Sequence, residues 1–130
     1  MLIRGLVEAI LYVKDMNTQV QFYREMLELP LLFPPDLQDY SREHWVTFDT
    51  GACTLALHSG GQGRTGEDAS ELTYLVGDLG AARQTLIERG VAMGDIRTAA
   101  PGISVCPGCD PEGNRFSLEE RQSLGDHRSL

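Results

Sequence analysis

Three side chains of this sequence have the types and positions that acid–base or metal chemistry needs. Glu8 and Glu71 stand at equivalent places beside two apolar, β-branched stretches, and His58 ends the apolar run LALH. Two carboxylates that face one cavity repel each other, which raises the pKa of one and makes it a candidate general base. Carboxylate oxygens and imidazole nitrogens are also ligand types for divalent cations.

Each of these residues also has a plain structural interpretation. Glu8 and Glu71 could be solvated near strand ends or hydrogen-bonded across a sheet, since unpaired buried carboxylates are rare. A lone strand histidine such as His58 is often a packed, hydrogen-bonded residue, although it could equally serve as a ligand or a substrate contact. The sequence alone leaves these alternatives open.

The hydrophobic pattern of the first half predicts the elements that position Glu8 and His58. The stretch LVEAILYV (6–13) is typical of a strand, and Asp15 is the predicted N-cap of a helix that ends before Pro30. Three short strands are then predicted within the segments LLFPP, HWVTFDT and CTLALHS.

The second half repeats this order. A strand is predicted at 71–78, followed by a helix that Asp78 caps and Gly90 closes. Further strands are predicted at 91–98, 102–106 and 115–119. The offset between the halves is 63 positions at the first strand and helix, and 61 positions where LALH aligns with FSLE.

This duplication predicts an α+β fold of two βαβββ modules, with curled mixed sheets around a cavity. The modules span about 1–60 and 70–122, with a linker at 59–69 and a tail at 123–130, all within one domain of 130 residues.

The strand period of two then selects the side chains that face the cavity. Ala56 and His58 share one strand face, as do Ser117 and Glu119, while the intervening leucines and phenylalanine take the other face. We therefore expect Ser117 and Glu119 to contact a substrate. Trp45 and Phe48 are further candidates for the wall of an apolar ligand pocket.

Bulk composition excludes some classes of function. A net charge of −8 disfavours nucleic-acid binding, which needs a basic footprint. No apolar run reaches the ~18 residues of a membrane span, and the N-terminal stretch is too short and too charged for a signal peptide. We expect a cytoplasmic protein.

The pair Cys106-Pro107-Gly108-Cys109 is a C-x-x-C motif. A thioredoxin-like site needs this motif at a helix N-terminus, and here a turn and a strand follow it. A structural zinc site needs two more ligands, and Cys53 is the only further thiol. Reduced thiols are therefore the favoured interpretation.

Three stretches carry a family resemblance, namely AILYVKDMNTQVQFYREMLELPLLF, LTYLVGDLGAARQTLIERGV and DPEGNRFSLEE. With them, the chain resembles the vicinal oxygen chelate superfamily of glyoxalases, bleomycin-resistance proteins and extradiol dioxygenases. The resemblance implies a homodimer and one divalent metal whose ligand positions fall on Glu8, Ala56, Glu71 and Ser117. Ala56 cannot bind a metal and Ser117 is a poor ligand, which leaves Glu8, Glu71 and His58 as candidate ligands for Mn, Fe, Ni, Mg or Zn.

Two functions follow from the resemblance. The first is a glyoxalase-like or dioxygenase-like enzyme, a possible metal-dependent lyase in which Glu8 or Glu71 is the general base. The alternative is a metal-free protein that sequesters a small, cationic molecule, as bleomycin-resistance proteins do.

Overall fold

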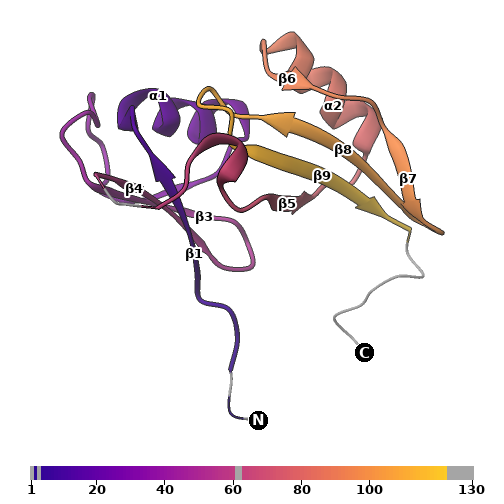
Figure 1. Ribbon diagram of the computed structural model, residues 1–130, viewed down its shortest axis with the longest axis horizontal. Helices are drawn as coiled ribbons and strands as arrows, with labels where there is room; N and C mark the ends of the chain where they lie inside the picture. Colours follow the sequence, from indigo (N-terminus) through magenta and orange to yellow (C-terminus); the bar gives the residue numbers. More distant parts are fainter. Residues whose placement is uncertain (1, 3, 61–62, 123–130) are drawn as a thin grey trace. The chain divides into compact units, whose positions relative to one another are not determined.

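The computed structural model describes residues 2, 4–60 and 63–122 (Figure 1). The chain divides into two compact units, residues 1–69 and residues 70–130. Each unit contains one mixed β-sheet and one principal helix. The predicted tail at 123–130 and positions 61–62 of the predicted linker lie outside the described residues.

The first unit has a four-stranded sheet in the order β1-β4-β3-β2. Strands β1 and β4 run parallel, and the other pairs are antiparallel. Its elements are β1 (Glu8–Val13), α1 (Met16–Gln21), a π-helical turn (Phe22–Met26), β2 (Leu31–Phe33), β3 (Trp45–Asp49), β4 (Thr54–Ser59) and a 3₁₀ turn (Gly66–Asp68).

Local chemistry explains where the first helix begins. The Asp15 carboxylate accepts hydrogen bonds from the backbone N–H of Thr18 at 3.1 Å and from the Thr18 hydroxyl at 2.8 Å. Asp15 is therefore the N-cap of the helix, as predicted. The helix was predicted to continue in α-form up to Pro30. Instead, α-helical bonding ends at Gln21, and the N–H of Leu27 bonds back five residues to Phe22 at 3.2 Å.

The core of the first unit lies between this helix and one face of the sheet. Side chains on that face alternate with those on the opposite face, as the strand period requires. The buried members on the strands are Leu11, Val13, Val46, Phe48, Leu55 and Leu57. Met16, Val20 and Tyr23 meet them from the helical segment.

The second unit has five strands, in the order β5-β9-β8-β6 with β7 also paired to β8. Its elements are β5 (Leu72–Leu75), α2 (Leu79–Glu88), β6 (Ala92–Met93), β7 (Arg97–Ala100), β8 (Ile103–Cys109) and β9 (Arg115–Arg121). Helix α2 starts at the predicted cap, because the Asp78 carboxylate accepts the N–H of Ala81 at 3.0 Å. It ends at Glu88, and Gly90, two residues further on, has a φ of +83° that suits a glycine C-terminal to a helix.

The single strand predicted at 91–98 is two strands, β6 and β7. Met93 pairs with Gly108 of β8, and Arg97 pairs with Val105 of β8. The chain therefore advances four residues from β6 to β7, while β8 advances only three residues between the two pairs. The surplus residue interrupts the ladder around Gly94, which lies close against Pro107. The structure also shortens the predicted strand 71–78 to Leu72–Leu75 and extends the predicted 102–106 and 115–119.

The register of the two sheets confirms the internal repeat. Ile10 pairs with Ala56 in the parallel β1/β4 ladder, and Thr73 pairs with Ser117 in the parallel β5/β9 ladder. These are the residues that the sequence offsets of 63 and 61 make equivalent. The predicted α+β fold of two βαβββ modules is therefore confirmed, with two mixed, unclosed sheets. None of the helices in the described part of the chain has the length and apolar character to cross a membrane.

Candidate functional site

The helix-free face of the first sheet carries three rows of side chains that the strand register sets directly opposite one another. The first row, called the aromatic row below, contains Tyr12 of β1, His58 of β4 and Trp45 of β3. The two rows that follow along the strands are Ile10, Ala56 and Thr47, and then Glu8, Thr54 and Asp49. The face therefore changes from aromatic to small and apolar, and then to polar.

Within the aromatic row, His58 contacts a ring on each side. The ring centroids of Tyr12 and His58 are 5.4 Å apart with an interplanar angle of 69°, and those of Trp45 and His58 are 5.5 Å apart at 83°. Both contacts are edge-to-face, the arrangement that aromatic quadrupoles favour. All three side chains are half-buried, so the row is partly accessible.

One polar atom in this row is left unsatisfied. Nδ1 of His58 is buried and has no hydrogen-bond partner among the described residues. Buried polar atoms in folded proteins are nearly always paired, so an exception calls for an explanation. This nitrogen is closed to solvent, so the accessible parts of the row are its rings, and these can hold a flat apolar molecule.

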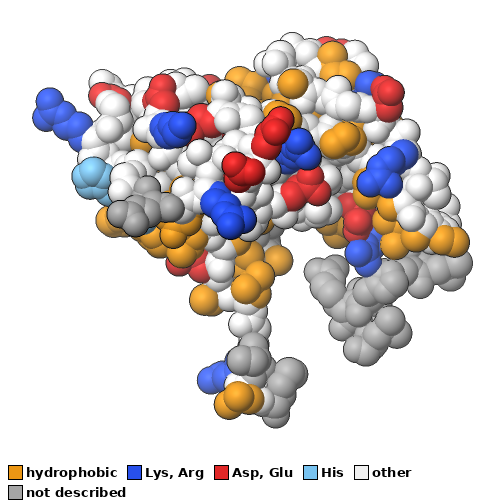
Figure 2. All heavy atoms as spheres, in the orientation of Figure 1, with side chains coloured by type: hydrophobic (Ala, Val, Ile, Leu, Met, Phe, Trp, Pro, Cys, Tyr) orange, Lys and Arg blue, Asp and Glu red, His pale blue; other side chains and the backbone are white. Residues whose placement is uncertain are grey.

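The surroundings of the row are apolar as well. Figure 2 shows hydrophobic side chains gathered over the part of the first unit that β1, β3 and β4 form, and Ile10 of the second row is 45% exposed. On another side, the backbone of Gly63 lies against the Tyr12 ring so closely that a Cβ at position 63 would overlap it. A side chain at position 63 would therefore displace either the ring or this segment.

The donors of the first sheet do not fit one metal ion. Glu8 and His58 lie on the same face, but Glu8 pairs with Thr54 and His58 with Tyr12, four residues further along. At ~3.3 Å per residue this separates the two backbone positions by ~13 Å, whereas two ligands of one ion lie within ~4 Å of each other. Ala56, between them, has no donor and is fully buried. The described residues contain no group of three or more His, Cys, Asp or Glu side chains that could hold a metal.

The other polar residues that were predicted to line the site lie in the second unit. Ser117 and Glu119 share one face of β9, as predicted, and both are half-buried. The Glu119 carboxylate forms an ion pair with Arg121 two residues on. Glu71 was expected inside a strand, but β5 begins at Leu72 and Glu71 is exposed.

The two aromatic residues predicted as pocket walls lie on opposite faces of β3. Trp45 is in the aromatic row, whereas Phe48 is fully buried in the core with its ring 6.4 Å from that of Tyr23. Phe48 is thus a core residue in this structure. It lies three positions after Trp45, and residues separated by an odd number in a strand point to opposite faces, so the sequence already indicated that the two cannot line the same pocket. Tyr12 was missed as a site residue, although it stands four positions after Glu8 on the same strand and so shares its face.

The C-x-x-C pair does not form a joint site. Cys106 and Cys109 lie three residues apart on the extended strand β8, so their side chains leave opposite faces. Their Cα atoms are ~10 Å apart at ~3.3 Å per residue, beyond the ~7 Å that a disulfide tolerates. Both are free thiols.

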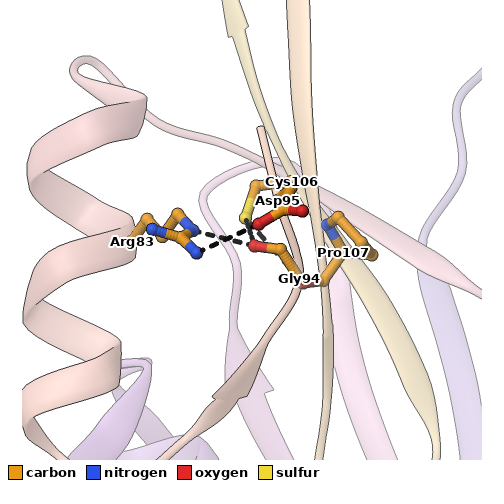
Figure 3. A network of polar contacts seen from close by, with 5 residues as sticks. All are labelled: Arg83, Gly94, Asp95, Cys106 and Pro107. Carbon is orange, nitrogen blue, oxygen red and sulfur yellow. Dashed lines mark hydrogen bonds and ion pairs between the residues drawn. The ribbon is translucent and has the colours of Figure 1, made fainter. Parts of the chain in front are cut away.

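Cys106 is instead part of a small polar network in the core of the second unit (Figure 3). Its thiol donates to the carbonyl of Gly94 at 3.2 Å, which also accepts from Nε of Arg83 at 2.8 Å. Arg83 reaches the exposed Asp95 at 3.6 Å. Burial raises the pKa of the Cys106 thiol, and the Arg83 guanidinium partly opposes the shift.

Comparison with known proteins supports the fold. No protein-family model matches the chain, and no curated protein matches it. Among solved structures, TnmS3, an antibiotic-binding protein from Streptomyces sp. CB03234, has a TM-score of 0.77 at 24% identity over 94% of this chain and 99% of its own. A glyoxalase/bleomycin resistance protein/dioxygenase superfamily member from Sphaerobacter thermophilus has a TM-score of 0.74 at 24% identity over 93% and 100%.

A lactoylglutathione lyase from Agrobacterium tumefaciens has a comparable TM-score of 0.73, at a lower identity of 16% over 95% of this chain and 97% of its own. The resemblance seen in the sequence is therefore confirmed at the level of the fold, which is that of the glyoxalase/bleomycin-resistance/dioxygenase proteins. Proteins with this fold include enzymes and binding proteins, so function has to be argued from the residues.

Proposed function

We propose that this protein binds a small organic molecule with a flat, largely apolar ring system on the aromatic row, and that binding needs no metal ion. The observation that carries the proposal is the partly accessible row of three rings, in which His58 is held edge-to-face between Tyr12 and Trp45. The poor fit of the first sheet to a metal supports a binding role. The similarity in fold to an antibiotic-binding protein agrees with it.

The size of the row sets the affinity to look for. A two-ring molecule that buries ~200 Å² of apolar surface gains about 5 kcal/mol at ~25 cal/mol per Å². Ring–ring contacts contribute about 0.5–1.5 kcal/mol more. Before the cost of lost translational and rotational freedom, these terms correspond to dissociation constants of roughly 20–200 μM, which are lower limits. Titrations should therefore extend to the solubility limit of each probe.

Trp45 provides the assay, because it is the only tryptophan in the chain. The protein is dialysed against EDTA and titrated with 9-aminoacridine, anthraquinone-2-sulfonate and 2-naphthol, while Trp45 fluorescence is followed with inner-filter correction. We expect saturable quenching by at least one compound, unchanged when Mn²⁺ or Zn²⁺ is added. The cationic, anionic and neutral probes also test whether the net charge of −8 favours a cationic ligand.

Two variants of the same residue type make the test specific. His58→Ala should weaken binding at least tenfold, because it removes the centre of the row. His44→Ala is the matched control, since His44 is exposed and its Nδ1 lies 3.3 Å from the Ser59 hydroxyl. Equal affinity in both variants, or no saturable quenching by any probe, would contradict the proposal.

The second candidate is a metal-dependent, glyoxalase-like enzyme. It is favoured by Glu8, a half-buried carboxylate on the same sheet face as the aromatic row. In this proposal the metal is Mn, Fe, Ni, Mg or Zn, and Glu8 is its candidate ligand on the first sheet, since His58 lies too far along that sheet to hold the same ion. Glu71 is the candidate ligand of the second unit, where Ser117 and Glu119 are the candidate substrate contacts. Elemental analysis of protein purified without chelators tests it: stoichiometric metal, lost in Glu8→Ala or in Glu71→Ala, would favour the enzyme over the metal-free binder.

We further propose that the protein is a homodimer, as the family resemblance implies, and that it is cytoplasmic. Light scattering on the purified chain, with and without the best probe, measures the first. Fractionation of the cells that make the protein measures the second.

A further inference from the structure

An irregularity in the edge strand β2 turns one more aromatic side chain to the helix-free face of the first sheet. Leu31 of β2 pairs with Phe48, which points into the core. Two residues later, Phe33 pairs with Thr47, the neighbour of Phe48 on β3. A regular ladder would pair Leu32 with Thr47 and would send Phe33 to the core face. The extra residue of β2 instead sets Phe33 opposite Thr47, on the face that carries the aromatic row.

The position of Phe33 continues the aromatic row onto the fourth strand. Thr47 and Trp45 are two residues apart on β3 and share a face, so Phe33 is a diagonal neighbour of Trp45. Such neighbours lie ~7–8 Å apart, a distance that aromatic side chains can bridge. Phe33 is 57% exposed, and Leu32 beside it is 50% exposed. An accessible apolar surface therefore adjoins the row at β2.

The segment that carries Phe33 is held in place by hydrogen bonds on both sides. Before β2, the carbonyl of Pro30 accepts the N–H of Asp49 at 2.9 Å. After β2, the buried Tyr40 donates its hydroxyl to the carbonyl of Pro34 at 3.0 Å and accepts the N–H of Leu37 at 3.3 Å. An exposed ring on a fixed backbone costs little ordering entropy when a ligand binds, so it is suited to recognition.

We infer that Phe33 is a further contact of the ligand, and that the site prefers planar molecules of three or more fused rings over smaller ones. The inference rests on the proposed function, because Phe33 extends the same site. The aromatic row covers two strand spacings, ~10 Å, and Phe33 adds a third, which brings the length to ~14 Å. A two-ring molecule is accommodated by the row alone, whereas a longer ring system also reaches Phe33.

A matched pair of ligands tests this inference by calorimetry. The compounds 4-aminoquinoline and 9-aminoacridine carry the same amine on two and on three fused rings, and both are cations at neutral pH. Wild-type protein should bind 9-aminoacridine about threefold or more tightly, because the third ring buries additional apolar surface. Any apolar surface would favour the larger compound to some degree, so variants are needed to assign the preference to Phe33.

Three variants make this assignment. Phe33→Ala should weaken the binding of 9-aminoacridine about two- to twelvefold, the range of one ring–ring contact, and leave that of 4-aminoquinoline unchanged. Phe33→Tyr keeps the ring and should keep the preference. Ile87→Ala is the control, since Ile87 is another exposed apolar residue, on α2 of the second unit, and should affect neither compound. Both positions are exposed, so the variants should fold, which a thermal melt checks.

The outcomes distinguish the inference from the proposed function. If Phe33→Ala weakens both compounds equally, or neither, the inference is overturned while the proposed function survives. If Phe33→Ala changes the molecular mass in light scattering and leaves both affinities unchanged, Phe33 lies between copies of the chain, and the inference is overturned as well. If neither compound binds wild-type protein up to its solubility limit, the aromatic row does not take flat rings, and the proposed function fails together with the inference.

Discussion

Replacing two aromatic residues of the same strand should separate the stability of this protein from its binding. Trp45 and Phe48 are three positions apart on β3 and lie on opposite faces of the sheet. Phe48 is fully buried and packs near Tyr23, whereas Trp45 is half-buried beside His58. Truncation of each side chain to alanine therefore removes a different kind of contact.

The magnitudes follow from burial. Phe48→Ala opens a cavity in the core and should lower the free energy of unfolding by about 3–5 kcal/mol. Domains of this size have ~5–15 kcal/mol of stability in total, so the melting temperature should fall by about 10–15 °C. Trp45→Ala leaves no closed cavity and should lower the free energy of unfolding by only about 1–2 kcal/mol.

Binding should show the opposite order. At 15 °C, folded Phe48→Ala should bind the best aromatic probe with wild-type affinity, and Trp45→Ala should bind it at least tenfold more weakly. Urea denaturation followed by circular dichroism measures stability, and calorimetry measures binding, so neither assay depends on the tryptophan signal. If Phe48→Ala lost the binding while Trp45→Ala kept it, the assignment of faces on β3 would be refuted.

Three further predictions concern other parts of the chain. Gly63→Ala should weaken probe binding several-fold with little loss of stability, because its Cβ would overlap the Tyr12 ring; calorimetry and a thermal melt check this. Asp110→Ala should lower the free energy of unfolding by about 2–4 kcal/mol in urea titrations. The buried carboxylate accepts from the backbone N–H of Asn114 at 3.0 Å and from its side-chain amide at 2.8 Å. Cys106 should be alkylated far more slowly than Cys109 at pH 8 in a mass-spectrometric time course, because burial raises the pKa of its thiol; equal rates would contradict this.

The raised pKa of Cys106 also fixes the sign of its effect on stability. The folded state favours the neutral thiol, so its contribution is fully present below the ordinary thiol pKa of ~8.5. The contribution declines as the pH rises through the higher folded-state pKa. Cys106→Ala should therefore remove part of the alkaline loss of stability.

Helix starts and the repeat could be predicted because short-range chemistry determines them. Asp15 and Asp78 cap their helices in the predicted way, since the signal needs only the carboxylate and the N–H three residues on. The offset between the modules reappears as the pairing of Ile10 with Ala56 and its equivalent in the second unit. Hydrophobic patterns fix strand register strongly, because a slip of one residue would turn every apolar side chain to the wrong face.

The irregular features could not be predicted from the hydrophobic period, which describes only regular helices and strands. The interruption around Gly94 between β6 and β7 exists because this segment has one residue more than the matching part of β8. The π-helical turn Phe22–Met26 likewise departs from the regular α-pattern on which the prediction relied. The first depends on a partner strand distant in sequence, to which periodicity is blind, and nothing in the structure explains the second.

The candidate site was predicted in part. His58 and Trp45 were selected from the sequence, and the register sets them in one row. Tyr12 was not selected from the sequence, and its part in the row emerges only when β1 and β4 are paired. The catalytic and metal roles of Glu8 and Glu71 were predicted from their equivalent places in the two halves and from the family resemblance, and Glu8 lies too far along the sheet to share an ion with His58.

The most direct test of the central claim is to locate a bound ring on the protein. Protein freed of metal by EDTA is mixed with 2-naphthol, and intermolecular nuclear Overhauser effects are recorded between the naphthol protons and assigned side chains. The account predicts contacts with the rings of Tyr12 and Trp45, and none with Phe48. Contacts confined to other surfaces, or binding that appears only after a divalent metal is restored, would contradict it.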